Sequence, residues 1–399
     1  MRNLLLAFCL LAFGAMGWAV DARESKLTPV LSPDGHQVWM VDSDRFAIAH
    51  RMASPFELAG EFQFSPDGRY VYAASPQGWI VKFDLWSFSV VATARIGLGV
   101  PNLAVSGDGS WVMATGAETP ALSLLDASLR LVRSYDVRAA DGKQTSRIAT
   151  LHVAPARKSF FVALKDSPEI WEISYDRNAE PIYEGLVHDY RMGEAIPKPG
   201  FLGVKRTILD ESLEDIFFFV DGRHALGRAR SNVAGSSQLH VINLDIRRRI
   251  SLVALPGLAS PGSAVSFAQA GTAMLAIPDR QAGLVNVVEV KSWKFLKTIE
   301  TVARGIVLRS HENADHLWIA SRQVAPDHAG LILIDKKTLA VVAPVSELQY
   351  PLMRIAFTRD GQRVLASQQD ITAPWMVYQT RTLVELGRVP MDASPEGVR

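Results

Sequence analysis

The sequence predicts an all-β fold, an eight-bladed β-propeller, and three observations support this. Turns of the Ser-Pro-Asp-Gly type recur along the chain, and each is followed by a strand in which apolar and polar residues alternate. Further alternating strands follow most of these turns, while convincing amphipathic helices are absent. A turn followed by three strands is the order of a propeller blade, so we expect residues 20–399 to form a single propeller domain.

The turns define the units of the repeat. The clearest begin at Ser32, Ser65, Ser106 and Thr358, and their Asp-Gly pairs supply the positive φ that tight hairpins need. Weaker copies near residues 155, 221, 270 and 313 bring the count to eight units of about 47 residues, a normal size for four-stranded blades. A β-sandwich or a series of small β domains would need linkers, and no Ser/Gly-rich or Pro-rich linker separates the units.

Composition narrows the function. The chain has 399 residues, of which 48% are hydrophobic and 21% charged, and this excludes a disordered or low-complexity protein. Its 42 Lys and Arg balance 41 Asp and Glu, so we expect no nucleic acid as a partner and no general attraction to anionic membranes. The single cysteine excludes an intramolecular disulfide, a Cys-rich zinc site and a CxxCH attachment for c-type haem.

The N-terminal segment has the pattern of a secretory signal peptide. A short basic start precedes an apolar run from Leu4 to Met16, and Gly17 and Ala19 place small residues where a signal peptidase reads. We therefore expect residues 1–19, with Cys9, to be removed and the protein to be periplasmic. The apolar run is short for a membrane anchor, and no other stretch is long and apolar enough to span a membrane.

Three phrases carry a resemblance to a known family. They are Leu-Lys-Asp-Ser-Pro-Glu-Ile-Trp at 164–171, Val-His-Asp-Tyr-Arg-Met-Gly-Glu at 187–194 and Arg-Ser-His-Glu-Asn at 309–313. Over nearly its whole length the chain resembles the d1 propeller of cytochrome cd1-type nitrite reductase and its relatives in haem d1 biosynthesis, most of all the dihydro-haem d1 dehydrogenases. The resemblance implies a cytochrome d1-like propeller that holds a tetrapyrrole, haem d1 or a late precursor, in its central channel.

The sequence departs from this family in two respects. The dehydrogenases carry an N-terminal cytochrome c domain that accepts electrons, and no CxxCH motif is present here. Relatives also carry three histidines, one of them an iron ligand, for which the matching stretches 58–64, 259–263 and 353–357 have none. We therefore do not expect nitrite reductase activity, while oxidation of a haem d1 precursor, with a separate cytochrome as electron acceptor, stays open.

The longest interval between turn signals contains the first group of candidate residues. The residues that make this interval longer than a simple connection between strands are 186–213. Long loops on propellers often carry function. His188 is the expected metal ligand or proton donor, beside Tyr190, with Arg191 expected to bind a ring carboxylate. The alternative is that His188 packs against Asp189 within the loop.

Four further residues complete the set of candidates. The resemblance implies that Arg147 lies next to the channel and pairs with a ring carboxylate, and the alternative is a surface salt bridge. Lys205 and Arg206 belong to a basic cluster around the long interval, which would suit an anionic ligand or an acidic partner protein. His311 is expected to be a hydrogen-bonded turn histidine.

Two functions of different classes follow from these observations. The first is a periplasmic propeller that binds haem d1 or a late precursor and takes an accessory part in haem d1 biosynthesis or in delivery to nitrite reductase in denitrification. Its expected partners are the tetrapyrrole and a periplasmic cytochrome or nitrite reductase. The second is a propeller without haem that acts as a protein-interaction scaffold, since fold alone decides neither.

Overall fold

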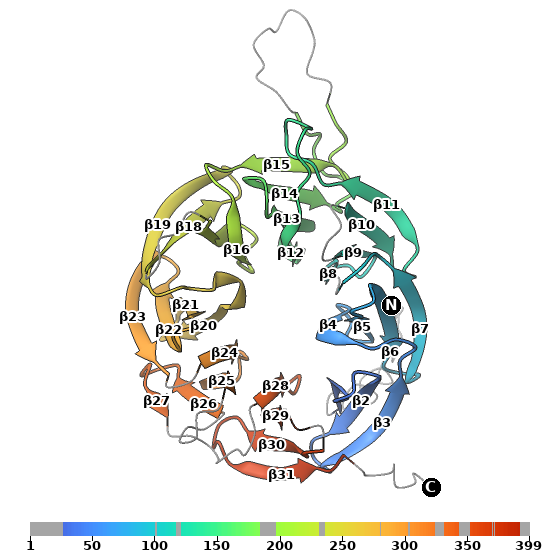
Figure 1. The fold of residues 1–399 in the computed structure, drawn as a ribbon, viewed down its shortest axis with the longest axis vertical. Helices are drawn as coiled ribbons and strands as arrows, with labels where there is room; N and C mark the ends of the chain where they lie inside the picture. Colours follow the sequence, from blue (N-terminus) through green and yellow to red (C-terminus); the bar gives the residue numbers. More distant parts are fainter. Residues whose placement is uncertain are drawn as a thin grey trace, which may run out of the picture.

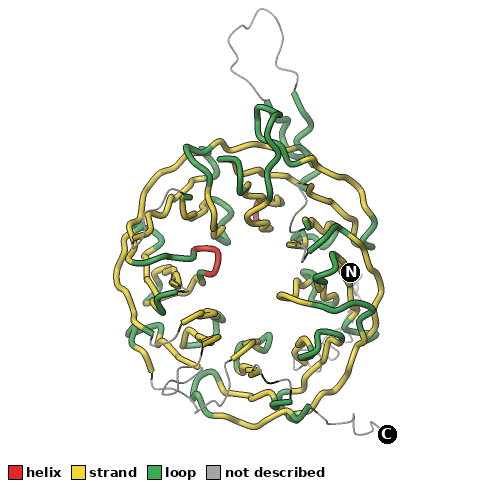
Figure 2. The backbone as a smooth tube through the Cα atoms, viewed as in Figure 1, coloured by secondary structure: helices red, strands yellow, loops and turns green. Residues whose placement is uncertain are grey.

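A computed structural model describes residues 27–99, 102–116, 121–183, 197–230, 236–279, 281–301, 304–323, 331–342, 352–368, 370 and 372–391. These residues form eight antiparallel sheets arranged as a ring (Figure 1), so the predicted eight-bladed propeller is confirmed. Two short 3-10 turns, Pro155–Arg157 and Pro261–Ser263, are the helical segments of this part of the chain (Figure 2). The predicted signal peptide at 1–19 lies outside the described residues.

The blades are numbered in chain order, and within each blade the strands run from the inside of the ring outward. The first four blades consist of β1 (Leu27–Leu31), β2 (Gln37–Asp42) and β3 (Ala47–Ala53); β4 (Ala59–Phe64), β5 (Tyr70–Ala74), β6 (Trp79–Asp84) and β7 (Ser89–Arg95); β8 (Asn102–Val105), β9 (Trp111–Thr115), β10 (Ala121–Asp126) and β11 (Leu131–Asp136); and β12 (Ile148–Ala154), β13 (Ser159–Leu164), β14 (Glu169–Ser174) and β15 (Val204–Ile208).

The other four blades follow the same plan. They consist of β16 (Leu213–Phe218), β17 (His224–Ala229), β18 (Ser236–Asn243) and β19 (Arg248–Pro256); β20 (Val265–Gln269), β21 (Thr272–Asp279), β22 (Leu284–Glu289) and β23 (Lys294–Glu300); β24 (Arg304–Arg309), β25 (His316–Gln323), β26 (Leu331–Asp335) and β27 (Val341–Val342); and β28 (Leu352–Phe357), β29 (Arg363–Gln368), β30 (Trp375–Gln379) and β31 (Glu385–Val389).

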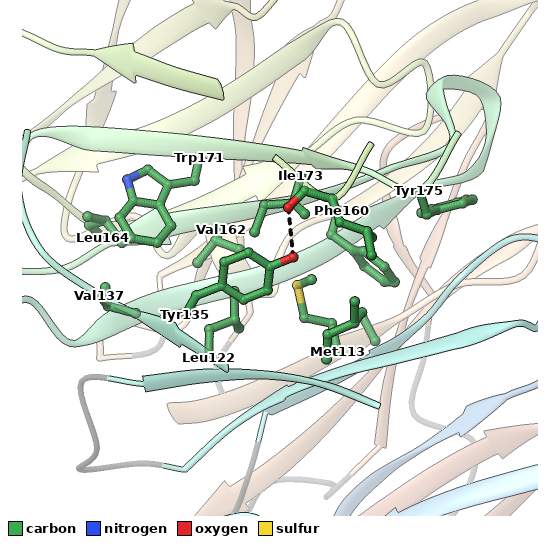
Figure 3. Packing of buried hydrophobic residues seen from close by; sticks show 13 residues of the cluster. Met113, Leu122, Tyr135, Val137, Phe160, Val162, Leu164, Trp171, Ile173 and Tyr175 are labelled. Carbon is green, nitrogen blue, oxygen red and sulfur yellow. Dashed lines mark hydrogen bonds between the residues drawn. The ribbon is translucent and has the colours of Figure 1, made fainter. Parts of the chain in front are cut away.

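Apolar side chains between neighbouring blades hold the ring together. Eight buried clusters, one at each blade-to-blade interface, alternate with the sheets around the ring. Between blades 3 and 4, the buried Tyr135 and Trp171 pack with aliphatic side chains, and the Tyr135 hydroxyl donates to the Leu202 carbonyl at 3.0 Å (Figure 3). Each strand face therefore buries its alternating apolar residues, as the sequence pattern predicts.

Blade 1 differs from the other seven because it has three strands among the described residues. Its β2–β3 pair has the features of a third and fourth strand elsewhere: a register shift, as in β6–β7, and a left-handed turn residue, Phe46 matching Phe88. The Leu58 amide donates to the Gly35 carbonyl, just as Ile96 donates to Gly78 in blade 2. β1 is therefore a second strand, and this blade has no innermost strand in the described part of the chain.

This assignment changes the meaning of one predicted turn. Ser65–Gly68 joins β4 to β5, the first and second strands of blade 2. Ser32–Gly35 joins β1 to β2, which take the positions of a second and a third strand in blade 1. The two turns share a sequence because either hairpin needs a left-handed glycine, with φ of 74° at Gly35 and 72° at Gly68. They lie at opposite ends of their blades.

The ring closes between blades 8 and 1. Val30 and Trp39 of blade 1 are buried against Leu365 and Trp375 of blade 8. Outside this cluster, the Arg51 guanidinium donates to the Met391 carbonyl at 3.1 Å. In the described ranges, no helix has the length and apolar character that crossing a membrane requires.

Candidate functional site

A cavity of about 930 Å³ lies inside the ring, on the side of blades 7, 8, 1 and 2. Its wall is formed by β1, by the innermost strands β4, β24 and β28, and by the turns that follow β4 and β28. It extends along the edge of β1 that faces the inside of the ring. Each of the other blades has an innermost strand at this position. Its volume lies near the upper end of the range of about 300–1,000 Å³ that small-molecule and cofactor sites occupy.

Arg354 is the partly buried cation of this cavity. It lies on β28, and its Nη1 donates to the Leu31 carbonyl at 3.2 Å. Among the described residues, no carboxylate lies within 4.0 Å of its guanidinium. Burial lowers the pKa of Arg354, but a guanidinium stays protonated at neutral pH. A buried charge without a counter-ion is costly, so the cavity favours an anionic ligand.

Two more arginines line the cavity, and one of them is paired with a carboxylate. Arg309 of β24 pairs with Glu61 of β4, so this ion pair joins blade 7 to blade 2. Arg359, in the turn after β28, places its guanidinium against Gly68 in the turn after β4, with Nη1 3.2 Å from where a Cβ would stand. The Arg309–Glu61 and Arg359–Gly68 contacts therefore join blades on the two sides of blade 1. In the described structure, no innermost strand of blade 1 lies between them.

His311 is the one histidine among the described residues that line the cavity. Its Nδ1 accepts a hydrogen bond from the Asn313 amide at 3.1 Å, and its ring lies 5.6 Å from that of Phe357. With Nδ1 accepting, Nε2 carries the proton of the neutral ring. His311 is therefore a hydrogen-bonded turn histidine, as predicted.

Aromatic side chains line the mouth of the cavity. Phe64 and Trp86 are 49% and 54% exposed although both line the cavity wall. The Arg69 guanidinium lies 4.6 Å above the Trp86 ring, a cation–π contact that orients the indole. Exposed aromatic faces next to a cavity provide stacking surfaces for a planar ligand.

Two buried donors in the cavity wall have no partner. Thr28 Oγ1 on β1 and Trp375 Nε1 on β30 are both inaccessible to water and make no hydrogen bond to the described residues. The side chains belong to residues that are 5% and 2% exposed. Buried polar groups are normally satisfied, and Arg228 Nε, His316 Nδ1 and Trp318 Nε1 are further exceptions in the described structure, away from this cavity.

The structure does not bring the predicted site residues together at this cavity. His188, Tyr190 and Arg191 lie outside the described residues, so their assignment stays a prediction. Arg147 lies just before β12, with its guanidinium bound to both carboxylate oxygens of Asp166 at 2.7 and 2.9 Å. This ion pair lowers the pKa of Asp166 to about 2.

Lys205 and Arg206 lie on β15, the outermost strand of blade 4, away from the 930 Å³ cavity. Arg206 Nη1 contacts the buried Glu169 at 2.5 Å, with the guanidinium 4.6 Å above the Trp171 ring. Lys205 faces a smaller pocket of about 390 Å³, and its Nζ lies 4.0 Å from Glu172. Three nearby arginines are also paired: Arg223 with Asp245, and Arg228 and Arg230 with Glu214.

Sequence reasoning missed Arg354, Arg359, Thr28 and Trp375 as site residues. Arg354 had a usable signal, because it is a charge within the otherwise apolar Leu-Met-Arg-Ile-Ala-Phe strand at 352–357. Thr28 and Trp375 had none, since only the three-dimensional structure shows that their polar atoms are unpaired. No group of three or more His, Cys, Asp or Glu that could hold a metal ion occurs in the described ranges.

Comparison with known proteins gives two matches over nearly the whole chain. The model of the Cytochrome D1 heme domain family matches residues 22–188 and 200–398. Dihydro-heme d1 dehydrogenase of Pseudomonas aeruginosa is 35% identical over 379 residues, which make up 94% of this chain and 71% of that protein.

Solved structures agree with the sequence matches. The structure of dihydro-heme d1 dehydrogenase NirN in complex with DHE has a TM-score of 0.78 at 35% identity, and the match covers 92% of this chain and 74% of that one. The β-propeller domain of Cps50 (Swd1) of Myceliophteria thermophila has a TM-score of 0.52 at 13% identity over 79% of this chain and 95% of that one. The second likeness concerns the fold alone.

Proposed function

Because the chain belongs to the Cytochrome D1 heme domain family, we propose that it binds haem d1 or a late tetrapyrrole precursor in the 930 Å³ cavity. The observation that carries the proposal is Arg354, a partly buried guanidinium in the cavity wall with no carboxylate partner in the described structure. The family match and the relative solved in complex with DHE support the choice of ligand.

The residues of the cavity suit such a ligand. A tetrapyrrole of this kind is a planar ring with carboxylate side chains, so it needs flat apolar surfaces and cationic partners. Phe64 and Trp86 offer the surfaces, and Arg354 and Arg359 would hold carboxylates. His311 would donate from Nε2 to the ring or to one of its substituents. When bound, the group supplies the redox chemistry of its iron and its conjugated ring.

In this proposal the protein handles the tetrapyrrole and passes it on in the periplasm, as an accessory to haem d1 biosynthesis or to delivery to nitrite reductase. His188 stays a predicted metal ligand, and it lies outside the described residues. A second candidate function is oxidation of a haem d1 precursor, favoured by the 35% identity to the dehydrogenase. Electrons would then pass to a separate cytochrome, since the chain contains no CxxCH motif.

A visible-absorption titration with haem d1 tests the proposed site. We expect the protein to bind with a dissociation constant in the micromolar range or below, and Arg354→Leu to weaken binding at least about tenfold, because a charge-assisted hydrogen bond to carboxylate is lost. Arg388→Leu is the matched control, since Arg388 pairs with Glu385 on the outermost strand of the same blade. Equal affinity of the two variants would place the ligand elsewhere, and no band change with the unaltered protein would favour the haem-free scaffold.

A further inference from the structure

His311 is seated on a turn of the neighbouring blade. It follows β24 of blade 7 and lines the cavity, and its ring lies against Gly361 in the turn that joins β28 to β29 of blade 8. A Cβ added to Gly361 would stand 2.0 Å from His311 Nδ1 and 2.5 Å from its Cε1. No side chain fits at such distances, so the imidazole occupies space that only a glycine at position 361 leaves free.

This contact is separate from the role of the glycine in its own turn. Gly109 belongs to the matching turn of blade 3, and its φ of 71° is close to the 67° of Gly361. A Cβ on Gly109 would meet Pro66 Cδ at 3.4 Å, which is an ordinary van der Waals contact. Both turns need a glycine for their backbone conformation, whereas Gly361 is also needed for the position of the His311 side chain.

Hydrogen bonds fix the segment that carries His311. Lys336, which is 7% exposed, donates from Nζ to the His311 carbonyl at 2.7 Å and to the Ala314 carbonyl. Asn313 donates from its backbone amide to His311 Nδ1 at 3.1 Å, and from Nδ2 to the Asp360 carbonyl of blade 8 at 3.0 Å. The backbone and the ring of His311 are therefore held from both blades.

The residues that hold His311 stand behind the cavity wall. Neither Gly361 nor Lys336 lines the cavity, but both contact His311, which does. With Nδ1 bound to the Asn313 amide, the ring offers Nε2 to a ligand. An imidazole held in one position loses little conformational freedom on binding, so its hydrogen bond to a ligand contributes more to the affinity.

We propose that Gly361 and Lys336 are positioning residues for ligand binding: they hold the His311 imidazole at the boundary between blades 7 and 8, where Nε2 donates to an acceptor of the bound tetrapyrrole. The inference rests on the proposed function, since it takes the tetrapyrrole as the ligand of the cavity. It adds that two residues outside the cavity wall determine the affinity, and that both act through one side chain.

A double-mutant cycle in haem d1 titrations tests the coupling between Gly361 and His311. Gly361→Ala is expected to bind about tenfold more weakly, because the added methyl group displaces the imidazole and its hydrogen bond is lost. His311→Ala should cause a loss of similar size. The double variant should bind no more weakly than His311→Ala, because no ring is left to displace. Losses that multiply in the double variant would show that Gly361 acts without His311, and would overturn the inference.

Gly109→Ala is the matched control. It adds the same methyl group at nearly the same φ, so it should lower the melting temperature through backbone strain. We expect it to bind haem d1 as tightly as the unaltered protein, because its methyl group meets no residue that positions His311. Equal weakening of binding by Gly109→Ala and Gly361→Ala would attribute the effect to strain in the turns and contradict the positioning role.

Lys336→Met tests the second contact. The variant keeps a long side chain but removes the ammonium group that binds two carbonyls of the His311 segment. We expect weaker binding of haem d1 when His311 is present, and no further loss in the His311→Ala background. A lower melting temperature with unchanged affinity would show that Lys336 stabilises the fold alone, and its assignment as a positioning residue would be wrong.

Further results separate this inference from the proposed function. In NMR spectra of the ligand-free protein, the ring signals of His311, identified by their loss in His311→Ala, should shift in Gly361→Ala and stay in place in Gly109→Ala. If the unaltered protein binds haem d1 while Gly361→Ala and Lys336→Met bind it equally well, the positioning role fails although the function stands. If the unaltered protein does not bind haem d1, both proposals fail, even where the NMR signals move as expected.

Discussion

At the scale of single residues, the Leu-Lys-Asp-Ser-Pro-Glu-Ile-Trp phrase at 164–171 is explained by Glu169. This buried carboxylate accepts hydrogen bonds from the Trp171 indole at 3.0 Å, the Ala140 amide at 2.6 Å and the Ser167 hydroxyl at 3.1 Å. Arg206 supplies the positive charge. The phrase that resembles the family most specifically thus joins β14 to its outermost neighbour β15 and to the preceding loop.

Replacement of Glu169 should therefore affect stability and leave ligand binding unchanged. We expect Glu169→Gln to lower the free energy of unfolding by about 3 kcal/mol, because Arg206 loses its buried counter-ion and one donor loses its acceptor. Denaturant unfolding measures the change, with Glu385→Gln as the control for a solvent-exposed Glu–Arg pair, for which about 0.5 kcal/mol is expected. A similar loss in both variants would contradict this account of Glu169.

His152 makes stability depend on pH. Burial lowers its pKa from 6.5 to about 4, and its ring stacks on Phe218 with 5.5 Å between centroids. Between these two pKa values the unfolded chain binds a proton that the folded chain does not, so stability falls as the pH is lowered from about 6.5 to about 4. The loss contributed by this group approaches about 3 kcal/mol at the acidic end.

His152→Phe keeps a ring against Phe218 and removes the titration. We expect the unaltered protein to lose about 2 kcal/mol more than this variant between pH 7 and pH 4.5, measured as the free energy of unfolding in urea. Parallel stability curves over this range would show that His152 titrates in the folded protein much as it does in the unfolded chain.

At the scale of strands and turns, the sequence pattern predicted the sheets correctly but not the position of each turn within its blade. Alternating strands after Asp-Gly turns predicted eight sheets, because each strand must bury every second side chain between blades. The pattern could not tell which hairpin a turn belongs to. Ser32–Gly35 and Ser65–Gly68 are almost identical in sequence, yet they join different strand pairs. The repeat therefore could not show that β1–β3 take the second to fourth positions of blade 1 in the described structure.

The candidate site was predicted less well, for a related physical reason. Basic residues were grouped by their spacing along the chain, but Lys205 and Arg206 stand on an outermost strand with acidic neighbours from the same sheet. The cavity takes its residues from β1, β4, β24 and β28, which are far apart in sequence and meet only when the ring closes. Whether a charge is paired depends on these long-range contacts.

At the scale of the whole molecule, the described residues form a closed ring in which blade 1 has three strands and each other blade has four. Eight interblade clusters, including the one between blades 8 and 1, fix the inner strands around the cavity. The three described strands of blade 1 pack on both neighbouring blades. Inside blade 1, where the described residues contain no innermost strand, the cavity extends to β1.

The central claim is that a tetrapyrrole occupies this cavity beside β1. A crystal structure of the protein with haem d1 bound tests it most directly. The account predicts one ring between the inner strands of blades 7, 8 and 2, with a carboxylate within hydrogen-bond distance of the Arg354 guanidinium. A ring bound elsewhere, for instance at the pocket of Lys205, or a cavity filled by the protein's own chain, would contradict it.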